Sequence, residues 1–446
     1  MAQLFGTDGV RGIANTELTC DIAFKLGQAA VVFLGKTIVV GKDTRLSGDM
    51  LESAVAAGIM SMGGTVLLAG IIPTPGIALL TSKLHGDGGI VISASHNPPE
   101  YNGIKFFNSQ GFKLSDALEL QVETFVLEGG AKGEDLPSGD AVGVAIPVES
   151  GCEMYIENVV NSILEQGINF EGLHIALDVG HGASALTSEA ALRRLGAHVT
   201  TINDDFNGLD INVGCGSTCL DFLHDLMKET GADVGIAHDG DADRVMIVGT
   251  DGLEIDGDMI EAVCALDMKQ RGVLKGNMVA TTVMGNLGFF HAMREAGIEV
   301  LQTKVGDRYV LEAMIEKGCV LGGEQSGHLI MLEHNTTGDG LLVAAQFLAA
   351  CKRQGKTVEE AASVMKRVPQ VLINVKGVDK AGLSTNTTLL SAIEAAEKEM
   401  GETGRVLIRP SGTEPLVRVM VEAFDSVLAE RIAQTLAETV KSELSL

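Results

Sequence analysis

The sequence predicts an α/β fold, in which three similar α/β domains with mixed sheets are followed by a smaller α+β domain. Short apolar runs alternate with helix-like segments along most of the chain, and this alternation is typical of α/β layers. The pattern changes near Val368, where strand-like runs are combined with a charged helix. At 446 residues, and with about 150 residues in a typical domain, the chain is long enough for three or more domains.

The apolar runs stand before glycine-containing loops, which is typical of buried strands. The predicted strands are 37–40, 65–68, 89–92, 174–177, 199–202, 234–237 and 278–281. The helix-like segments between them are 49–62, 184–195, 221–230 and 287–296. Strand and helix therefore alternate in the order that α/β domains require.

A recurring unit of helix, glycine and strand indicates three related domains. It spans 54–66, 190–199 and 291–300. In each case a glycine stands where the helix should end, and these stops are Gly63, Gly196 and Gly297. Boundaries near residues 147, 252 and 367 give domains 1–147, 148–252 and 253–367.

The remaining segment, 368–446, predicts the α+β domain. Its expected elements are a strand at 371–375, a Ser/Thr-rich helix start at Ser384, a charged helix through Met400, strands at 405–410 and 416–423, and a terminal helix. We expect this small domain to cap the others.

The charge balance limits the kinds of partner. A formal charge of −26, from 33 basic and 59 acidic residues, disfavours nucleic acid or an anionic membrane surface. An anionic small molecule would need a local basic pocket. The basic residues in or beside polar and glycine-rich loops are Arg11, Lys42, Arg45, Lys105, Arg244, Lys304, Arg308, Arg409 and Arg418. We expect such a pocket to be built from them.

Cysteine usage and hydropathy indicate a cytoplasmic protein. The 7 cysteines are scattered and form no paired CxxC motif, so neither a disulfide framework nor a structural zinc site is favoured. Cys215 and Cys219 form a close pair without a second pair of ligands nearby, and we interpret them as ordinary small residues. The amino terminus has no apolar signal core, and no run approaches the roughly 18 apolar residues of a membrane span.

The run GIVISASHNPPEYNGIKFF carries the first chemical motif, because an apolar strand ends there in Ser93, Ser95, His96 and Asn97. Ser95 is the favoured nucleophile for a phosphoryl group, and Ser93 is the competitor. A serine at a strand end is by default a turn or helix cap, and that interpretation would hold without the acidic loop below. A hydrolase triad is not indicated, because neighbouring side chains of an extended chain point apart and no GxSxG motif occurs.

Two basic residues accompany this serine. We expect His96 to contribute hydrogen bonding and charge to the site. Lys105, on the strand that follows, would polarise a phosphate or move a proton if burial lowers its pKa. The alternative for Lys105 is a solvated lysine at a sheet edge.

Asp239, Asp241 and Asp243 alternate in a short loop between two apolar strands. Alternate carboxylates can converge on one cation, and hard oxygen ligands favour Mg²⁺. A calcium EF-hand fits poorly, because its sixth and twelfth positions would be Arg244 and Thr250 rather than Gly and Glu. The alternative is a solvated acidic turn. With the serine, the loop predicts phosphoryl transfer assisted by a divalent metal.

Three further loops carry polar or basic groups. Arg11 lies in GTDGVRG, where it could contact an anion, although this signal is weak alone. The loop 323–328, GEQSGH, offers groups that suit sugar hydroxyls, with a polar turn as the alternative. RPSGTEP followed by Arg418 is a strong anion-binding pattern, because small residues let backbone N–H groups approach phosphate oxygens while guanidinium groups supply charge. No Walker or GxGxxG motif calls for a nucleotide.

With these five loops identified, the chain closely resembles the α-D-phosphohexomutase superfamily. The resemblance runs nearly end to end through FGTDGVRG, SASHNP, DGDADR, GEQSGH and RPSGTEPLVRV, in the superfamily's order. GEQSGH, INVGCGST and TVMGNLG are similar to its glucosamine branch, whereas the mannose/glucose branch more often has Met at the position of Gln325. The resemblance implies three similar α/β domains and a smaller fourth domain around one central cleft.

The resemblance also implies roles for single residues. Ser95 would be the phosphoserine and, with Asp239, Asp241 and Asp243, would bind one Mg²⁺. Arg11, Lys105 and Arg244 would assist transfer beside His96, and His328 is a candidate for proton transfer. The sugar contacts would be Glu324 and Ser326. The distal phosphate would be held by Arg409, Ser411, Gly412, Thr413 and Arg418.

The implied activity interconverts glucosamine 6-phosphate and glucosamine 1-phosphate. Phospho-Ser95 would form a 1,6-bisphosphate that turns around before Ser95 recovers a phosphoryl group, with a hexose 1,6-bisphosphate as activator. The product would feed UDP-N-acetylglucosamine and cell-wall precursor synthesis.

The resemblance suggests a homodimer, and the fourth domain is expected to swing to close the site. A glucose or mannose phosphate mutase, a metal-dependent phosphatase and a catalytically silent sugar-phosphate sensor are the alternatives.

Overall fold

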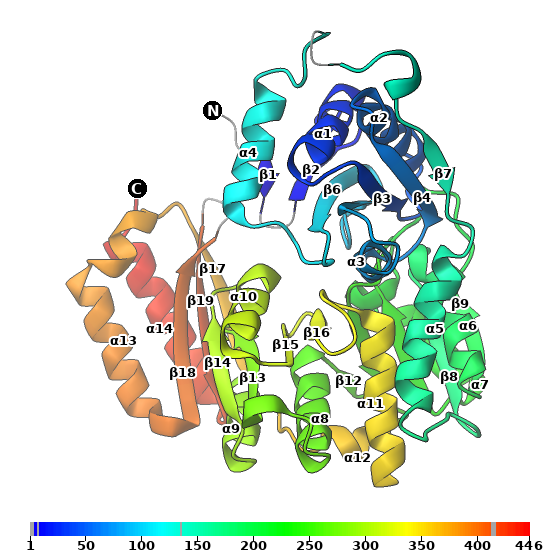
Figure 1. The fold of residues 1–446 in the computed structure, drawn as a ribbon. Helices are drawn as coiled ribbons and strands as arrows, with labels where there is room; N and C mark the ends of the chain where they lie inside the picture. The colour runs from blue at the N-terminus through cyan, green and yellow to red at the C-terminus, as the bar shows by residue number, and fades with distance from the viewer. Residues whose placement is uncertain (1–3, 7–8, 134–135, 412–415) are drawn as a thin grey trace. The chain divides into compact units, whose positions relative to one another are not determined.

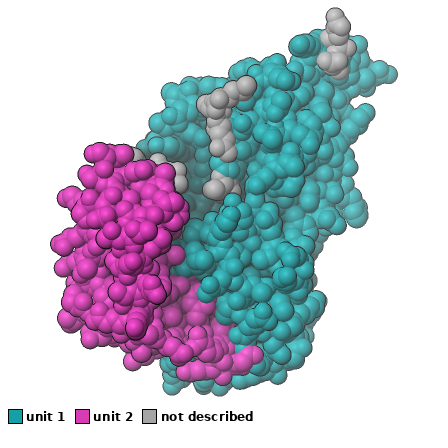
Figure 2. Space-filling model, turned by 90° about the vertical axis from the view of Figure 1, so that its left-hand side faces the viewer, with its two compact units in different colours: residues 1–284, 298–364 teal, residues 285–297, 365–446 magenta. Residues whose placement is uncertain are grey.

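The computed structural model of the protein describes residues 4–6, 9–133, 136–411 and 416–446 (Figure 1). The chain divides into two units (Figure 2). Unit 1 comprises Met1–Met284 and Ile298–Val364, and unit 2 comprises Gly285–Gly297 and Met365–Leu446. Within the described residues, no helix has both the length and the apolar character needed to cross a membrane.

The first sheet of unit 1 has 7 strands in the order β1-β2-β6-β5-β3-β4-β7. The strands are β1 Phe5–Gly6, β2 Gly9–Ile13, β3 Thr37–Lys42, β4 Thr65–Ile71, β5 Gly88–Ile92, β6 Tyr101–Asn108 and β7 Ala145–Pro147. The accompanying helices are α1 Cys20–Phe33, α2 Gly48–Ser61, α3 Thr74–Lys83 and α4 Asp116–Leu127. Strands β3, β4 and β5 run parallel, whereas β6 is antiparallel to β5 and β2, so the sheet is mixed as predicted.

Alternation along the central strands of this sheet explains how both faces are covered. Ile38 and Val40 of β3 are fully buried in the core that α1, α2 and α4 share with the sheet. Gly41 and Gly89 lie on the opposite face, where a Cβ would approach the Ile77 side chain of α3 to 2.5 and 3.2 Å. Glycine therefore lets α3 approach this face closely. The serine that follows β5 is consequently presented from a strand buried on both sides.

The second sheet has the order β12-β11-β10-β8-β9. Its strands are β8 His174–Asp178, β9 His198–Ile202, β10 Val234–His238, β11 Val245–Val248 and β12 Glu254–Ile255. The helices α5 Gly151–Leu164, α6 Ser188–Arg194 and α7 Asp221–Thr230 accompany it. The single helix expected at 184–195 is wrong, because a 3-10 turn at Ala183–Leu186 is separated from α6 by Thr187, whose φ and ψ of −132° and −46° are not helical.

The third sheet has the order β14-β13-β15-β16, with β13 Met278–Thr282, β14 Glu299–Thr303, β15 Leu321–Gly323 and β16 Leu329–Met331. Its helices are α8 Gly257–Gln270, α10 Asp307–Lys317, α11 Gly340–Gln354 and α12 Val358–Ala362. The three predicted glycine stops have φ of +73°, +98° and +63° at Gly63, Gly196 and Gly297. Each glycine therefore takes the left-handed conformation that ends a helix.

Unit 2 contains a three-stranded antiparallel sheet in the order β17-β19-β18. Its elements are α9 Leu287–Glu295, β17 Gln370–Lys376, α13 Thr387–Met400, β18 Gly404–Pro410, β19 Leu416–Ala423 and α14 Ser426–Glu443. The helix start expected at Ser384 is wrong: Ser384 ends a 3-10 turn, and α13 begins after Asn386, whose side chain accepts from the N–H of Leu389. Three mixed or parallel-rich α/β sheets and a smaller α+β part confirm the predicted fold class.

A buried carboxylate of unit 2 contacts residues 285–297, which belong to the same unit. Glu422 accepts hydrogen bonds from the side chain of Asn286 at 3.0 Å and from the N–H of Leu287 at 2.9 Å. The domain boundaries 147, 252 and 367, the last of which would place this segment in the third domain, stay a prediction.

Candidate active site

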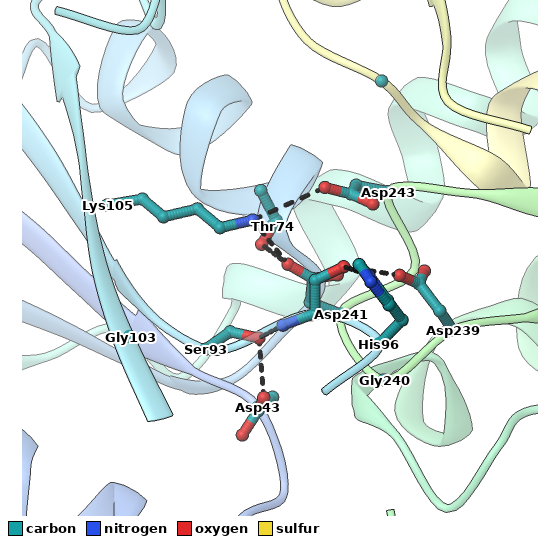
Figure 3. A network of polar contacts seen from close by, with 12 residues as sticks. Asp43, Thr74, Ser93, His96, Gly103, Lys105, Asp239, Gly240, Asp241 and Asp243 are labelled. Carbon is teal, nitrogen blue, oxygen red and sulfur yellow. Dashed lines mark hydrogen bonds and ion pairs between the residues drawn. The ribbon is translucent and has the colours of Figure 1, made fainter. Parts of the chain in front are cut away.

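The serine loop, residues 93–97, follows β5 and contains one residue in a strained backbone conformation. Ser95 is 1% exposed and has a φ of +51°, a left-handed conformation that costs a non-glycine residue about 1–2 kcal/mol. The neighbouring Ser93 supports it, since its Oγ accepts from the N–H of Ser95 at 2.9 Å and donates to Asp43 at 2.6 Å. Figure 3 shows Ser93 pointing to Asp43. Ser93 is therefore occupied with holding the loop, which favours Ser95 as the reacting serine.

Arg45 fixes the carbonyl groups of the same loop. Its side chain is fully buried, and its Nη2 donates to the carbonyls of Ser95 and Asn97 at 2.9 and 2.7 Å. Its Nη1 donates to the carbonyls of Pro98 and Tyr101. This guanidinium satisfies carbonyls that a strained, buried loop would otherwise leave unpaired.

The acidic loop, residues 239–244, connects β10 to β11 and faces the serine loop. One oxygen from each of Asp239, Asp241 and Asp243 lies within 4.8 Å of the others, and all three side chains are buried. The Oγ of Ser95 donates to Asp239 at 2.7 Å. The acidic loop is thus a buried cluster beside the serine and not a solvated turn.

Cations from three parts of unit 1 surround this cluster. Lys105 of β6 is 2% exposed, and its Nζ lies 3.0 Å from Asp241 and 3.5 Å from Asp243 (Figure 3). Lys105 is therefore a buried partner of the acids and not a solvated edge lysine. His328 lies 3.5 Å from Asp243 through its Nδ1. The guanidinium Nε of Arg244 lies 3.9 Å from Asp243.

The pKa values of the acids depend on their burial and on the charges around them. Burial raises the pKa of Asp239 to about 8, with the charges of Asp243 and Asp241 adding to the shift. For Asp243, burial is outweighed by the charge of Lys105 and by the charge and hydrogen bond of His328, and its pKa falls below the usual range. Burial favours neutral His328, but Asp243 and Asp307 raise its pKa.

The acidic loop also fits a divalent cation. Within the described parts of the chain, Asp241 Oδ1 and Asp243 Oδ1 are buried and accept no hydrogen bond. Burying a charged carboxylate oxygen without a hydrogen-bond donor costs free energy unless a cation lies nearby. The same burial of negative charge raises the pKa of Asp239. Oxygen donors at this spacing suit a hard ion such as Mg²⁺. The cluster could therefore hold a metal ion.

His96 differs from its prediction in two respects. Its Nδ1 lies 3.2 Å from the Oγ of Ser95, because the left-handed backbone of Ser95 turns the two neighbouring side chains together instead of apart. Burial, followed by the charges of Arg244 and Arg11, lowers the pKa of His96 to about 4. Burial and the nearby cations therefore disfavour a charge on His96, whose role in the site stays a prediction.

The GEQSGH loop, residues 323–328, lies between β15 and β16 and touches the acidic loop. The N–H of Val245 donates to the carbonyl of Gly327 at 3.2 Å, and a Cβ on Gly327 would lie 2.2 Å from the carbonyl oxygen of Val245. Glu324 accepts from the N–H of Gly306. The charges of Asp239 and Asp243, followed by that of Glu324, raise the pKa of Arg244 against burial. Ser326 is exposed. His328 therefore lies beside the acidic cluster, and Glu324 lies near Arg244.

Sequence reasoning missed two polar residues that contact the site. Thr74, at the start of α3, donates from its hydroxyl to Asp241 at 2.6 Å (Figure 3). Asn212 donates from its side chain to the carbonyl of Ser95 at 2.9 Å. A threonine followed by proline at a helix start was a signal for Thr74, whereas Asn212 lies in INVGCGST, which the sequence indicated only as a resemblance to one branch of the superfamily.

Part of the expected basic pocket is not available to an anion. Arg45 donates to carbonyls, and Lys42 pairs with Asp49 and Glu52 at 2.6 and 2.5 Å. Arg308 pairs with Asp116 and with Glu119. Arg11, by contrast, lies at the serine loop, where its Nη1 donates to the Asn97 side chain at 3.1 Å.

Unit 2 carries the arginine loop, residues 409–418. Arg409 and Arg418 stand directly opposite each other in the β18–β19 register and are half-buried. Burial, followed by the charge of Arg418, lowers the pKa of Arg409. Ser411 is buried, and its carbonyl accepts from Lys380 at 2.7 Å, a third cation that the sequence did not indicate. The predicted contacts Gly412 and Thr413 lie outside the described residues.

The chain matches known families along most of its length. Models of phosphoglucomutase/phosphomannomutase match as domain I over residues 2–132, domain II over 153–252, domain III over 256–368 and the C-terminal domain over 372–439. The phosphoglucosamine mutase of Alkaliphilus metalliredigens (strain QYMF) is 48% identical over 451 residues, which cover 100% of both chains.

Solved structures agree in fold. A phosphoglucomutase/phosphomannomutase family protein from Burkholderia thailandensis has a TM-score of 0.81 at 24% identity, covering 99% of this chain and 98% of its own. The N-acetylphosphoglucosamine mutase of Aspergillus fumigatus, in complex with GlcNAc-6P and magnesium, has a TM-score of 0.71 at 15% identity, covering 100% and 96%. The family models and the full-length relative together establish that the chain is an enzyme of the phosphoglucomutase/phosphomannomutase family, within the α-D-phosphohexomutase superfamily.

Proposed function

We propose that the enzyme interconverts glucosamine 6-phosphate and glucosamine 1-phosphate through a phosphoserine at Ser95. The full-length relative of 48% identity is named a phosphoglucosamine mutase, which favours glucosamine over glucose or mannose. The observation that carries the proposal is the 2.7 Å hydrogen bond from Ser95 Oγ to Asp239, at the edge of a buried acidic cluster. A serine that only ended a strand would not need a cation site beside its hydroxyl.

The proposed reaction consists of two phosphoryl transfers. In the first, the bond between phosphorus and Ser95 Oγ breaks, and a new bond forms to the free hydroxyl of the sugar monophosphate, which loses its proton. The resulting 1,6-bisphosphate turns around and returns its other phosphoryl group to Ser95, and the second product takes up a proton. The donor phosphoserine is regenerated in each cycle, and a hexose 1,6-bisphosphate can supply the first phosphoryl group.

Mg²⁺ held by Asp239, Asp241, Asp243 and an oxygen of Ser95 or its phosphoryl group would offset charge on the transferred group. Lys105, Arg11 and Arg244 would offset the remaining charge. The proton from the sugar hydroxyl would enter the Asp243–His328 pair, whose facing atoms lie 3.5 Å apart. Neutral His96 would donate to or accept from the Ser95 oxygen without adding charge.

The two ends of the substrate would be held by different loops. Glu324 and Ser326 would bind sugar hydroxyls, because a carboxylate near Arg244 and an exposed hydroxyl in the same loop suit that recognition. Arg409, Ser411, Gly412, Thr413 and Arg418 would hold the phosphate that is not being transferred. The opposed pair Arg409 and Arg418 supports this role, since two like charges opposite each other are stabilised by a bound anion.

A substrate panel tests the proposal. Interconversion of glucosamine 6-phosphate and glucosamine 1-phosphate would be followed with MgCl₂ and a hexose 1,6-bisphosphate primer, with glucose and mannose phosphates alongside and free phosphate measured in each reaction. We expect preference for glucosamine, little phosphate release, and mass-spectrometric detection of phosphate on Ser95. Preference for glucose or mannose phosphate would show that the enzyme is a glucose or mannose phosphate mutase. Steady release of free phosphate would show a phosphatase, and binding without turnover would show a sugar-phosphate sensor.

A further inference from the structure

Asn212 is one side chain that contacts both loops of the proposed transfer site. It lies between β9 and α7, outside the loops that the sequence singled out as chemical. Its Nδ2 donates to the carbonyls of Ser95 and Asn97 at 2.9 and 3.3 Å. Its Oδ1 accepts from the N–H of Gly240 at 2.9 Å. A single planar amide therefore spans the distance between the serine loop and the acidic loop.

The two loops that Asn212 joins come from different sheets. The serine loop follows β5 of the first sheet, and the acidic loop follows β10 of the second. Gly240 stands between two of the three acids, so the position of its N–H sets the position of Asp239 and Asp241. The carbonyl of Ser95 is held from its own sheet by Arg45 and from the second sheet by Asn212.

Asn212 is itself held firmly. It has a φ of +62°, and its N–H donates to the carbonyl of Gly180 at 3.0 Å. Asp178, at the end of β8, accepts from the N–H groups of Gly180 and Gly216 at 2.9 and 2.8 Å. These contacts connect the segment carrying Asn212 to the strand beside β10. The amide can therefore transmit the position of the second sheet to the serine loop.

We infer that Asn212 is a positioning residue, which holds the Ser95 hydroxyl in register with the acidic loop. The inference rests on the proposed function of Ser95 and the three acids. Asn212 acts through backbone groups of Ser95, Asn97 and Gly240, so its loss should affect the transfer step and metal affinity more than substrate binding. A misplaced reacting group can cost about 100-fold in rate, and loss of a residue that orients metal ligands costs about 10- to 100-fold in metal affinity or activity.

Two substitutions distinguish the hydrogen bonds that Asn212 donates to the serine loop from the one that it accepts from Gly240. Asn212→Gly tolerates the positive φ and removes both the donor and the acceptor. Asn212→Asp keeps an oxygen for the N–H of Gly240 but loses the donor to the carbonyls of Ser95 and Asn97. Asn277→Gly is the matched control, because Asn277 is exposed and has a φ of +49°.

Three measurements apply to each variant. They are kcat and KM for glucosamine 6-phosphate, the Kd for MgCl₂ by calorimetry, and hydrogen exchange across residues 93–101 and 238–244. For Asn212→Gly we expect a kcat about 10- to 100-fold lower with KM within about twofold, weaker Mg²⁺ binding and faster exchange in both segments. For Asn212→Asp we expect a similar loss of kcat with faster exchange in 93–101 only. Asn277→Gly should match the wild type.

Specific outcomes overturn the inference. Wild-type kcat, Mg²⁺ affinity and exchange in Asn212→Gly would show that the loops keep their register without it. A raised KM with unchanged kcat would make Asn212 a substrate contact instead. A loss of activity that follows a lower Tm, with exchange raised throughout unit 1, would reduce its role to general stability. If the wild type does not interconvert glucosamine phosphates, the proposed function fails, whereas Mg²⁺ affinity and exchange still test Asn212.

Discussion

The serine loop and the arginine loop would both bind phosphate, but they are built in opposite ways. In the serine loop, the carbonyl of Ser95 is paired twice, with Arg45 and with Asn212, and Ser93 is occupied by Asp43. In the arginine loop, Arg409 and Arg418 face each other across two strands and lower the stability of the sheet by their repulsion. The serine loop is held by contacts within the protein, whereas we propose that the arginine loop binds an anion.

This difference fits the proposed division of work. The transfer step needs the serine oxygen at one fixed point, since in-line transfer tolerates little displacement. In the proposed reaction, the arginine loop would have to accept a phosphate on either end of the sugar as the bisphosphate turns around. The opposed guanidinium groups of Arg409 and Arg418 could serve both orientations of the bisphosphate.

The largest expected effect separates two serines of the same loop. Ser95→Ala should lower kcat of the mutase reaction at least about 1,000-fold, because the variant lacks the hydroxyl that would carry the phosphoryl group. Ser93→Ala removes the donor to Asp43 and the acceptor for the N–H of Ser95, and should reduce activity while leaving Ser95 phosphorylated by a bisphosphate. Phosphopeptide mapping and kcat would be measured for both. Phosphate on Ser93 in the Ser95→Ala protein would reverse the assignment.

The second prediction breaks the internal pairing of the serine loop. Arg45→Met keeps the length of the side chain but removes the ion pair with Asp43 and the guanidinium donors to several carbonyls. Removing one partner of a buried charge pair costs about 3–5 kcal/mol, so unfolding of unit 1 in urea should begin at a lower concentration.

Arg193→Met is the control for Arg45, since Arg193 is an exposed partner of Glu189 and exposed pairs contribute about 0–1 kcal/mol. Equal urea midpoints for the two variants would contradict the view that Arg45 is structural. A raised KM as the sole effect of Arg45→Met would return Arg45 to the anion pocket.

The comparison also separates what the sequence predicted from what it could not. Alternating carboxylates between two apolar strands were enough to predict that Asp239, Asp241 and Asp243 converge, because the neighbouring strands fix where the loop begins and ends. The end of β5 before Ser95 was predicted for the same reason. Local patterns were therefore enough to predict the groups that we propose to react.

The supporting contacts were not predictable, because they join residues far apart in the chain. Arg45 and Ser95 are 50 residues apart, and Asn212 and Ser95 are 117 apart. His96 was expected to contribute charge because the sequence reveals neither the burial of its ring nor the nearby charges of Arg244 and Arg11, which together lower its pKa. The expected helix at 184–195 failed because Thr187 leaves the helical conformation, which apolar spacing does not encode. The sequence can thus predict which residues belong to the site, but not the charges that surround each of them.

The third prediction concerns the arginine loop. Arg409→Ala should raise KM for glucosamine 6-phosphate about 10- to 100-fold, because a hydrogen bond to a charged group contributes about 1.5–3 kcal/mol. The Tm of unit 2 should not fall, since the substitution also removes the repulsion from Arg418. Arg431→Ala, at an exposed pair with Glu399, is the control in the same unit. An unchanged KM would exclude Arg409 from phosphate binding.

The smallest expected effect is on the unfolding free energy and comes from a buried acid of α8. This acid can be compared with the acidic cluster, where cationic side chains lie nearby. Glu261 is 1% exposed, and neither of its carboxylate oxygens has a hydrogen-bond partner among the described residues. Burial, with the charge of Asp258 adding to it, raises the pKa of Glu261 well above its usual range. Its carboxyl group therefore binds a proton more tightly in the folded protein than in the unfolded chain.

The sign of the pH dependence follows from that proton. As pH rises above about 4.5, the unfolded chain loses the proton first, so Glu261 lowers the unfolding free energy progressively up to its folded pKa. Glu261→Gln removes this dependence and should raise the unfolding free energy by about 1 kcal/mol at pH 8, because the buried amide retains part of the desolvation cost. The gain should vanish near pH 4.5. Exposed Glu229→Gln is the control, and a gain for Glu261→Gln that is equal at both pH values would show that the acid does not titrate differently on folding.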